Sequence, residues 1–179
     1  TLPMSDFFLF KRKALVSATP IIPTDPRFEE QNFLQQHIEP GYQYQIPLHL
    51  KVTNNIVASL KEYFNDNRQR RYFIFLNSVR AIASIIKALD IKDESIAFCS
   101  KDRADQLNYN DFNSSEKLCE FKKYNFFTSR FFSAVDILVK GQPQIILISD
   151  LVQAEHSMID PATEAIQIVG RFRKDVKKL

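Results

Sequence analysis

The chain has 179 residues, of which 45% are hydrophobic and 25% are charged. This composition is typical of a globular protein with an ordinary core, and it excludes collagen-like, low-complexity and wholly disordered chains. The formal net charge of +3 permits a polyanionic partner without requiring one. No apolar run approaches the roughly 20 residues that cross a bilayer, so we expect no membrane partner.

The cysteines and glycines narrow the class of protein further. Two cysteines, Cys99 and Cys119, are too few for a disulfide scaffold and indicate a reducing, cytoplasmic setting. The three glycines have neither phosphate-loop nor GxGxxG spacing, so we expect no phosphate loop in this chain. The histidines and cysteines lack metal-ligand spacing, and we expect no metal site.

Predicted strands and helices alternate along the chain. Residues 13–18 have the pattern of a buried strand end, a proline-rich stretch follows, and residues 47–53 alternate like a strand. Further strands are predicted at 71–76, 95–99, 123–128 and 144–149, and helices at 54–67, 79–89, 101–107, 116–122 and from about Asp160-Pro161. Asn77 or Ser78 is predicted to cap the helix at 79–89.

The strands are apolar on both faces and are separated by helices. This pattern predicts an α/β domain with a mostly parallel sheet covered on both sides. Ligands of such sheets lie outside the carboxyl ends of the strands. The polar residues at those ends are Asn77-Ser78, Ser100-Lys101, Thr128-Ser129-Arg130 and Ser149-Asp150.

Four short segments resemble motifs of superfamily 2 helicases, in the order that the family has them. Val16-Ser17-Ala18-Thr19-Pro20 is similar to motif III, and Phe75-Leu76-Asn77-Ser78 lies where motif IV would be. Residues 128–137 (TSRFFSAVDI) resemble motif V, and residues 167–173 (QIVGRFR) resemble motif VI, of the form Gln-x-x-Gly-Arg-x-x-Arg. Each motif alone is weak, but their order on an alternating α/β pattern is a stronger signal.

The resemblance implies a three-layer RecA-like domain of the phosphate-loop NTPase type that lacks its own phosphate loop. Residues 1–20 would be the tail of a first helicase domain, 21–46 a linker, and 47–179 the second RecA-like domain. The intact protein would bind ATP and Mg²⁺ between the two domains, mostly through the first, and would act on DNA or RNA. We expect neither cofactor to bind this fragment alone, and we expect the fragment alone to be inactive.

The resemblance also implies roles for individual residues. Catalytic roles fall on Arg171, Arg173 and Gln167, with support of the ATP site from Asp136, Gly170 and Lys174. Nucleic-acid contacts fall on Asn77, Ser78, Thr128, Ser129 and Arg130, and coupling between the domains falls on Ser17 and Thr19. Arginine suits the γ-phosphate because its permanently charged guanidinium binds phosphate oxygens bidentately.

Several alternatives stay open. Lys174 stands where the family has its second arginine and Ala134 where it has a glycine, which favours a degenerate domain that only binds nucleic acid or a protein partner. A motor that translocates without unwinding is equally compatible with the pattern. The residues alone also permit a solvated basic helix end at 171–178 and an ordinary turn cap at Thr128-Ser129. A flavodoxin-like domain is disfavoured because no flavin loop is present.

Overall fold

The structure is a computed structural model that describes residues 4–17, 19, 23–38, 48–66, 70–133 and 135–174. The chain divides into two compact units, Thr1–Val52 and Thr53–Leu179. Ala18 and Pro20 of the motif III-like segment, and Ala134 of the motif V-like segment, lie outside the described residues. The side chain of Lys174 does so as well.

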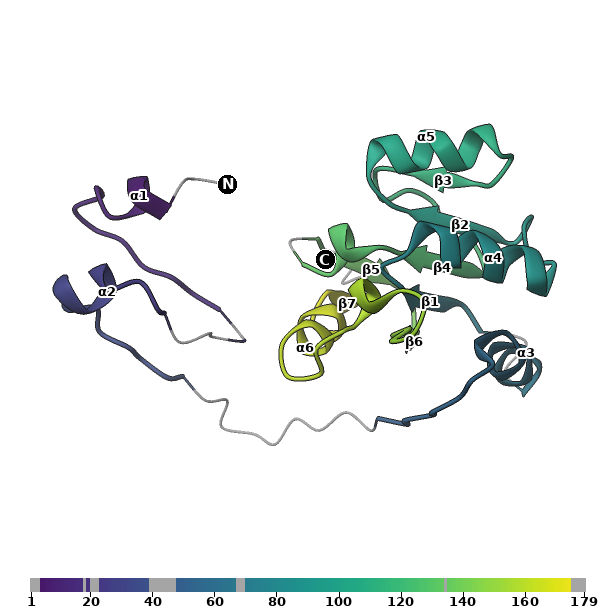
Figure 1. The fold of residues 1–179 in the computed structure, drawn as a ribbon, viewed down its shortest axis with the longest axis horizontal. Helices are drawn as coiled ribbons and strands as arrows, with labels where there is room; N and C mark the ends of the chain where they lie inside the picture. The colour runs from purple at the N-terminus through teal and green to yellow at the C-terminus, as the bar shows by residue number, and fades with distance from the viewer. Residues whose placement is uncertain are drawn as a thin grey trace, which may run out of the picture. The chain divides into compact units, whose positions relative to one another are not determined.

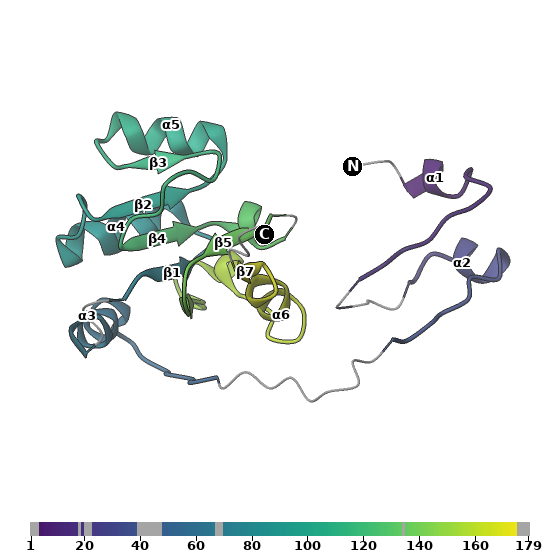
Figure 2. The same ribbon diagram turned by 180° about the vertical axis from the view of Figure 1, so that it is seen from behind.

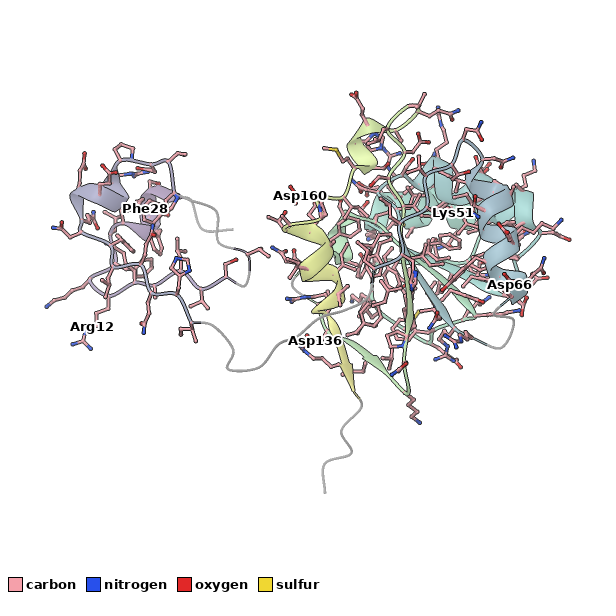
Figure 3. All side chains as sticks on the ribbon, turned by 90° about the horizontal axis from the view of Figure 1, so that it is seen from below. Arg12, Phe28, Lys51, Asp66, Asp136 and Asp160 are labelled. Atoms are coloured by element: carbon pink, nitrogen blue, oxygen red, sulfur yellow. The ribbon has the colours of Figure 1, made fainter. Side chains whose placement is uncertain are left out.

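The first unit is organised around a small group of aromatic rings. Its described helices are the single turns α1 (Met4–Phe7) and α2 (Arg27–Glu30). Four rings pack at centroid distances of 5.0–6.2 Å, and Figure 3 labels one of them; they are Phe7, Phe8, Phe28 and Phe33. The Arg27 guanidinium lies 4.3 Å from the Phe8 ring centroid, a cation–π contact.

The two strands predicted for the N-terminal third are wrong. Residues 13–17 and 48–53 belong to no strand, and Val16 and Leu50 are 95% and 86% exposed. Alternation of apolar and polar residues is present in both segments. A strand also needs a neighbour for its backbone N–H and C=O groups, and among the described residues neither segment pairs with one.

The second unit contains a five-stranded sheet in which every pairing is parallel. Figure 1 shows the strands in the order β3-β2-β4-β1-β6. Their bounds are β1 (Tyr72–Phe75), β2 (Ser95–Phe98), β3 (Ser114–Ser115), β4 (Tyr124–Phe127) and β6 (Gln144–Leu147). The α/β class and the parallel sheet predicted from the sequence are therefore confirmed.

The two faces of the sheet carry separate cores, which gives the unit three layers. On β1, Tyr72 and Ile74 face one core, whereas Phe73 and Phe75 face the other. This period of two explains why every residue of the strand is apolar. The first core packs against α3 (Ile56–Asp66), α4 (Val79–Leu89) and α5 (Lys101–Tyr109).

The second core packs against shorter elements that follow β4 in the chain. They are η1 (Ser129–Phe131), β5 (Ile137–Val139), α6 (Glu164–Val169) and β7 (Phe172–Lys174), and the ribbons of β5, α6 and β7 are labelled in Figures 1 and 2. A further short helix, η2 (Glu155–Ser157), lies between β6 and α6 in the chain. Strands β5 and β7 pair in parallel as a separate two-stranded sheet. The sequence did not predict either strand, and β7 replaces part of the basic helix end that the residues also permitted.

The helix predicted at 116–122 is wrong. The segment instead bends at residues 116–117 and continues without regular structure, and side chains take backbone bonds that a helix would need. Ser115 Oγ accepts a hydrogen bond from Lys117 N at 3.2 Å, and Asn125 Oδ1 accepts one from Lys122 N at 2.9 Å. Phe121 packs edge to face on Phe73, with ring centroids 5.3 Å apart, so its apolar character serves the second core.

Candidate functional site

The carboxyl ends of the parallel strands bring together residues that are far apart in the sequence. Strands β1 and β4 pair with Phe75 opposite Phe127, so Asn77 and Ser129 emerge side by side. Asn77 Oδ1 accepts a hydrogen bond from Ser129 N at 3.1 Å. The predicted motif IV and motif V positions are therefore in direct contact at this edge of the sheet.

Asn77 also holds the loop that follows β6. Its Nδ2 donates to the backbone carbonyl of His156 at 3.1 Å. Within that loop the fully buried Ser157 accepts from Asp150 N at 2.8 Å through its Oγ. The side-chain amide of Asn77 thus joins the chain after β1, the chain after β4 and the loop Asp150–Met158. We missed Ser157 in the sequence because a serine in a polar loop carries no signal of burial.

The neighbouring hydroxyls serve the fold as well. Ser78 caps α4, since its Oγ accepts from Ala81 N at 3.3 Å. Thr128 is 8% exposed, and its hydroxyl donates to the Phe98 carbonyl at 3.3 Å. Ser129 and Arg130 are exposed at the same edge. The nucleic-acid roles of all four residues stay predictions.

The motif VI-like residues lie where α6 ends and β7 begins. Arg171 Nε donates to the Gln167 carbonyl at 3.1 Å, which fixes the inner nitrogen of the guanidinium. Gly170 has an ordinary right-handed conformation, with φ −65°. A Cβ at position 170 would lie 3.2 Å from the Ile166 carbonyl oxygen, which is a tight contact. Glycine is therefore favoured because there is little room for a side chain, and not because the backbone needs a positive φ.

Strand β7 connects this segment to the motif V-like segment. Ile137 N donates to the Arg171 carbonyl at 2.8 Å, and Ile137 pairs with Phe172. Arg173 Nε lies 3.5 Å from Asp136 Oδ1. Figure 3 labels Asp136. The two side chains are 55% and 62% exposed, so the attraction is screened by solvent.

Phe172 decides which way the two arginines point. Its ring packs on Phe73 and Phe75 of β1, with centroids 5.1 and 6.1 Å apart. Because successive residues of a strand face opposite sides, the residues before and after Phe172 are directed away from the core. Arg171 is half-buried and Arg173 is exposed, and their roles at an ATP site stay predictions.

The predicted coupling residues lie in the first unit. The backbone N–H of Thr19 donates to Ser17 Oγ at 3.1 Å, a local turn, and Thr19 is 8% exposed. These residues and the residues at the sheet edge belong to different units. The coupling role of Ser17 and Thr19 stays a prediction.

Cys99 follows strand β2, and the pKa of its thiol decides whether it can act as a nucleophile. Burial raises the pKa of its thiol to about 11, against the smaller opposing effect of the Arg103 and Arg130 charges. The thiol is therefore neutral at physiological pH and is a poor nucleophile there. The same electrostatic effects show that Arg103 and Arg130 both lie near the end of β2.

The site contains planar cations and, among the described residues, no cluster of metal ligands. Arg171 and Arg173 supply the planar cations that suit phosphate oxygens. Among the residues that the structure describes, no group of three or more His, Cys, Asp and Glu side chains is arranged to hold a metal ion. In the same residues, no helix is long and apolar enough to cross a membrane.

The architecture of the second unit defines its fold class. It is an α/β domain with a five-stranded parallel sheet between layers of helices and short elements, consistent with a RecA-like domain. Comparisons with protein-family models, with curated proteins and with solved structures found no match. The chemistry of the site therefore has to be argued from its own residues.

Proposed function

We propose that the chain is the second RecA-like domain of an ATP-dependent helicase or translocase that acts on DNA or RNA. Arg171 and Arg173 face the γ-phosphate of an ATP molecule held against an N-terminal RecA-like domain. Asn77, Ser78 and the Thr128–Arg130 segment face the nucleic-acid backbone. ATP hydrolysis then alters the fit between the two domains and moves the nucleic acid.

The observation that carries this proposal is the parallel pairing of β5 with β7, beside which the exposed side chains of Asp136 and Arg173 also meet. It joins the two segments whose resemblance to motifs V and VI suggested the function. A helicase-like domain needs this connection, because the residues that sense the phosphate have to be coupled to those that touch the nucleic acid. A solvated basic chain end would not need it.

The chemistry assigned to the arginines is stabilisation of charge in the transition state. Phosphoryl transfer spreads negative charge over the equatorial oxygens of the γ-phosphate, and an arginine supplied from a second domain neutralises it. Loss of such an arginine lowers kcat by roughly 10³- to 10⁵-fold. Arg171 Nε donates to the Gln167 carbonyl, and among the described residues no hydrogen bond or ion pair uses the terminal guanidinium nitrogens, which supports this role.

The first test is the coding sequence upstream of Thr1. A GxxxxGK[ST] loop followed by an acidic Asp-Glu motif supports the motor, because these residues bind the phosphates and Mg²⁺. In that complete protein, Arg171→Ala is expected to abolish nucleic-acid-stimulated ATP hydrolysis, whereas Lys61→Ala on α3 leaves it unchanged. Full hydrolysis by Arg171→Ala would contradict the proposal.

The alternative is a degenerate RecA-like domain that binds nucleic acid or a protein without hydrolysis. Its support is the lysine at position 174 and the alanine at position 134, where the helicase pattern has arginine and glycine. An upstream region that lacks both phosphate-binding motifs would favour this alternative over the motor.

A further inference from the structure

The two lateral edges of the main sheet are finished differently. The strand order puts β3 at one edge and β6 at the other, as Figures 1 and 2 show. Strand β3 has two residues, and its outward-facing Ser114 N donates to Asn108 Oδ1 at 3.1 Å. A short strand whose outer donor is bonded to a side chain does not pair with another chain.

Strand β6 is open along its outer side. Gln144 N and Ile148 N both donate to carbonyls of the segment 71–75, at 3.4 and 2.9 Å, so the even-numbered residues direct their backbone groups towards β1. The odd-numbered residues Ile145 and Leu147 therefore direct their N–H and C=O groups away from β1. Among the described residues β6 pairs with β1 alone, which leaves these outward groups without a strand partner.

The open edge of β6 is also apolar and uncharged. Residues 143–149 (PQIILIS) contain no charged side chain. Every residue of β6 is half-buried, whereas every residue of β1, β2 and β4 is fully buried. Leu151 and Val152, which follow β6, are 61% and 93% exposed and continue the apolar surface. An unpaired edge of this kind is a template for a further strand.

The hydrogen-bonding pattern of this edge is complementary to itself. Antiparallel pairing of two β6 strands about a twofold axis at Ile146 places Ile145 of each copy opposite Leu147 of the other. The outward N–H and C=O groups of both residues then bond in pairs. Pro143 has no N–H to donate and limits the pairing to the residues after it.

The charges that flank β6 favour the antiparallel direction. Lys140 precedes the strand and Asp150 follows it, and neither forms a salt bridge within the part of the chain that the structure describes. Antiparallel pairing brings the Lys140 end of one copy to the Asp150 end of the other, whereas parallel pairing would bring like charges together. Because β3 is closed, the assembly stops at two copies.

We infer that the open edge of β6 is an interface between two copies of this chain, whose sheets join through antiparallel pairing of β6 about Ile146. The inference goes beyond the proposed function and does not depend on it. The partner strand supplies the bonds that Ile145 and Leu147 lack, and it covers the half-buried apolar side chains of β6.

The test is amide hydrogen exchange of the 179-residue chain, measured residue by residue by NMR at a low and at a high protein concentration. Sedimentation measures the mass in each solution. In the monomer, the amides of Ile145 and Leu147 should exchange quickly, while those of Ile146 and Ile148, which face β1, are protected. In the dimer, the protection of Ile145 and Leu147 should rise by at least about tenfold.

A lysine on the open edge should weaken the dimer. Leu147→Lys places a charge beside the partner strand and leaves the bonds between β6 and β1 in place. The matched control is Leu138→Lys, which adds the same charge to β5 at a position that is 59% exposed. We expect the dimer Kd of Leu147→Lys to rise by about tenfold or more, while the control matches the wild type.

Cross-linking tests the register. Ile146 faces its own copy across the axis as a non-hydrogen-bonded pair, with Cα atoms about 4.5 Å apart, which a disulfide can span. Ile146→Cys, in a Cys119→Ala background, should therefore form a disulfide-linked dimer under mild oxidation. Ile145→Cys in the same background is the control, because its Cα atoms would be about 7–8 Å apart, too far for a disulfide.

Each contrary outcome overturns the inference. A chain that stays monomeric at every concentration does so, and so does protection of Ile145 and Leu147 in the monomer, because another segment of the same chain then covers the edge. A dimer that Leu147→Lys and Leu138→Lys form equally well uses another surface. If Leu147→Lys does not fold, equal cross-linking of Ile146→Cys and Ile145→Cys overturns the inference by itself. None of these results bears on ATP hydrolysis, so the proposed function is tested separately.

Discussion

Cys99 ends strand β2 with 1% of its surface exposed, and burial raises the pKa of its thiol from the ordinary value of 9.0 to about 11. Between these two pH values the unfolded chain releases the thiol proton whereas the folded chain keeps it. The folded state then binds more protons than the unfolded state. Its free energy of unfolding must therefore fall as the pH rises through this window.

We expect the midpoint of thermal unfolding to decrease between about pH 9 and pH 10, and Cys99→Ala to make this decrease smaller. Tyr72, whose pKa burial raises to about 12, contributes at higher pH, so the lower window isolates the thiol. Calorimetry at half-unit pH intervals measures the effect. An identical pH dependence in the wild type and in Cys99→Ala would contradict the assignment. The exposed Cys119 provides a control through Cys119→Ala.

Asn77 and Ser78 illustrate how far a sequence predicts single residues. Both residues follow an apolar strand, which correctly predicts that they lie at the carboxyl edge of the sheet. The bonds of Asn77 to Ser129 N and His156 O connect residues 52 and 79 positions apart. Such partners follow from the pairing of β1 with β4 and from the course of the loop after β6. No local pattern contains that information.

At the scale of elements, α4 gives a direct test of local stabilisation. Ser78→Ala removes the hydroxyl that accepts from Ala81 N at 3.3 Å and is expected to lower the free energy of unfolding by about 1 kcal/mol. Ser100→Ala is the matched control, because Ser100 occupies the same position before α5 and its side chain forms no capping bond. Denaturant unfolding measures both. Equal losses in the two variants would show that the capping bond contributes nothing specific.

The elements predicted correctly are those whose pattern is complete within the element. The apolar stripe of α4, with Ile82, Ile85 and Ile86 buried, repeats at helical spacing and requires no knowledge of the rest of the chain. Strands β5 and β7 have three residues each and form only because residues 137–139 meet residues 172–174. The helix predicted at 116–122 was wrong for a similar reason. Asn125, which lies outside the segment, accepts a hydrogen bond from one of its backbone N–H groups.

At the scale of the whole molecule, the fold class was predictable because a strand buried on both faces leaves a continuous apolar run. Alternation along the strand puts Phe73 and Phe75 on the face opposite Tyr72, but the elements that cover each face follow only from the tertiary structure. The meeting of the chain after β1 with the chain after β4 was likewise not predictable, because it depends on the order of the strands in the sheet.

The second unit is expected to fold by itself. Every residue of its two cores lies between Leu60 and Ile168, so a chain of residues 53–179 retains all of them. Among the described residues of the first unit, Phe8 is the one buried hydrophobic side chain. Its neighbour Leu9 is 82% exposed. A segment that buries so little apolar surface does not compensate its own conformational entropy.

Calorimetry and far-ultraviolet circular dichroism of residues 53–179 should therefore show one cooperative unfolding transition, whereas residues 1–52 alone should show none. Hydrogen exchange provides the control, since the amides of β1 and β4 should be as protected in the shorter chain as in the full chain. If residues 53–179 instead unfold without a cooperative transition, part of the stability of the sheet comes from residues before Thr53.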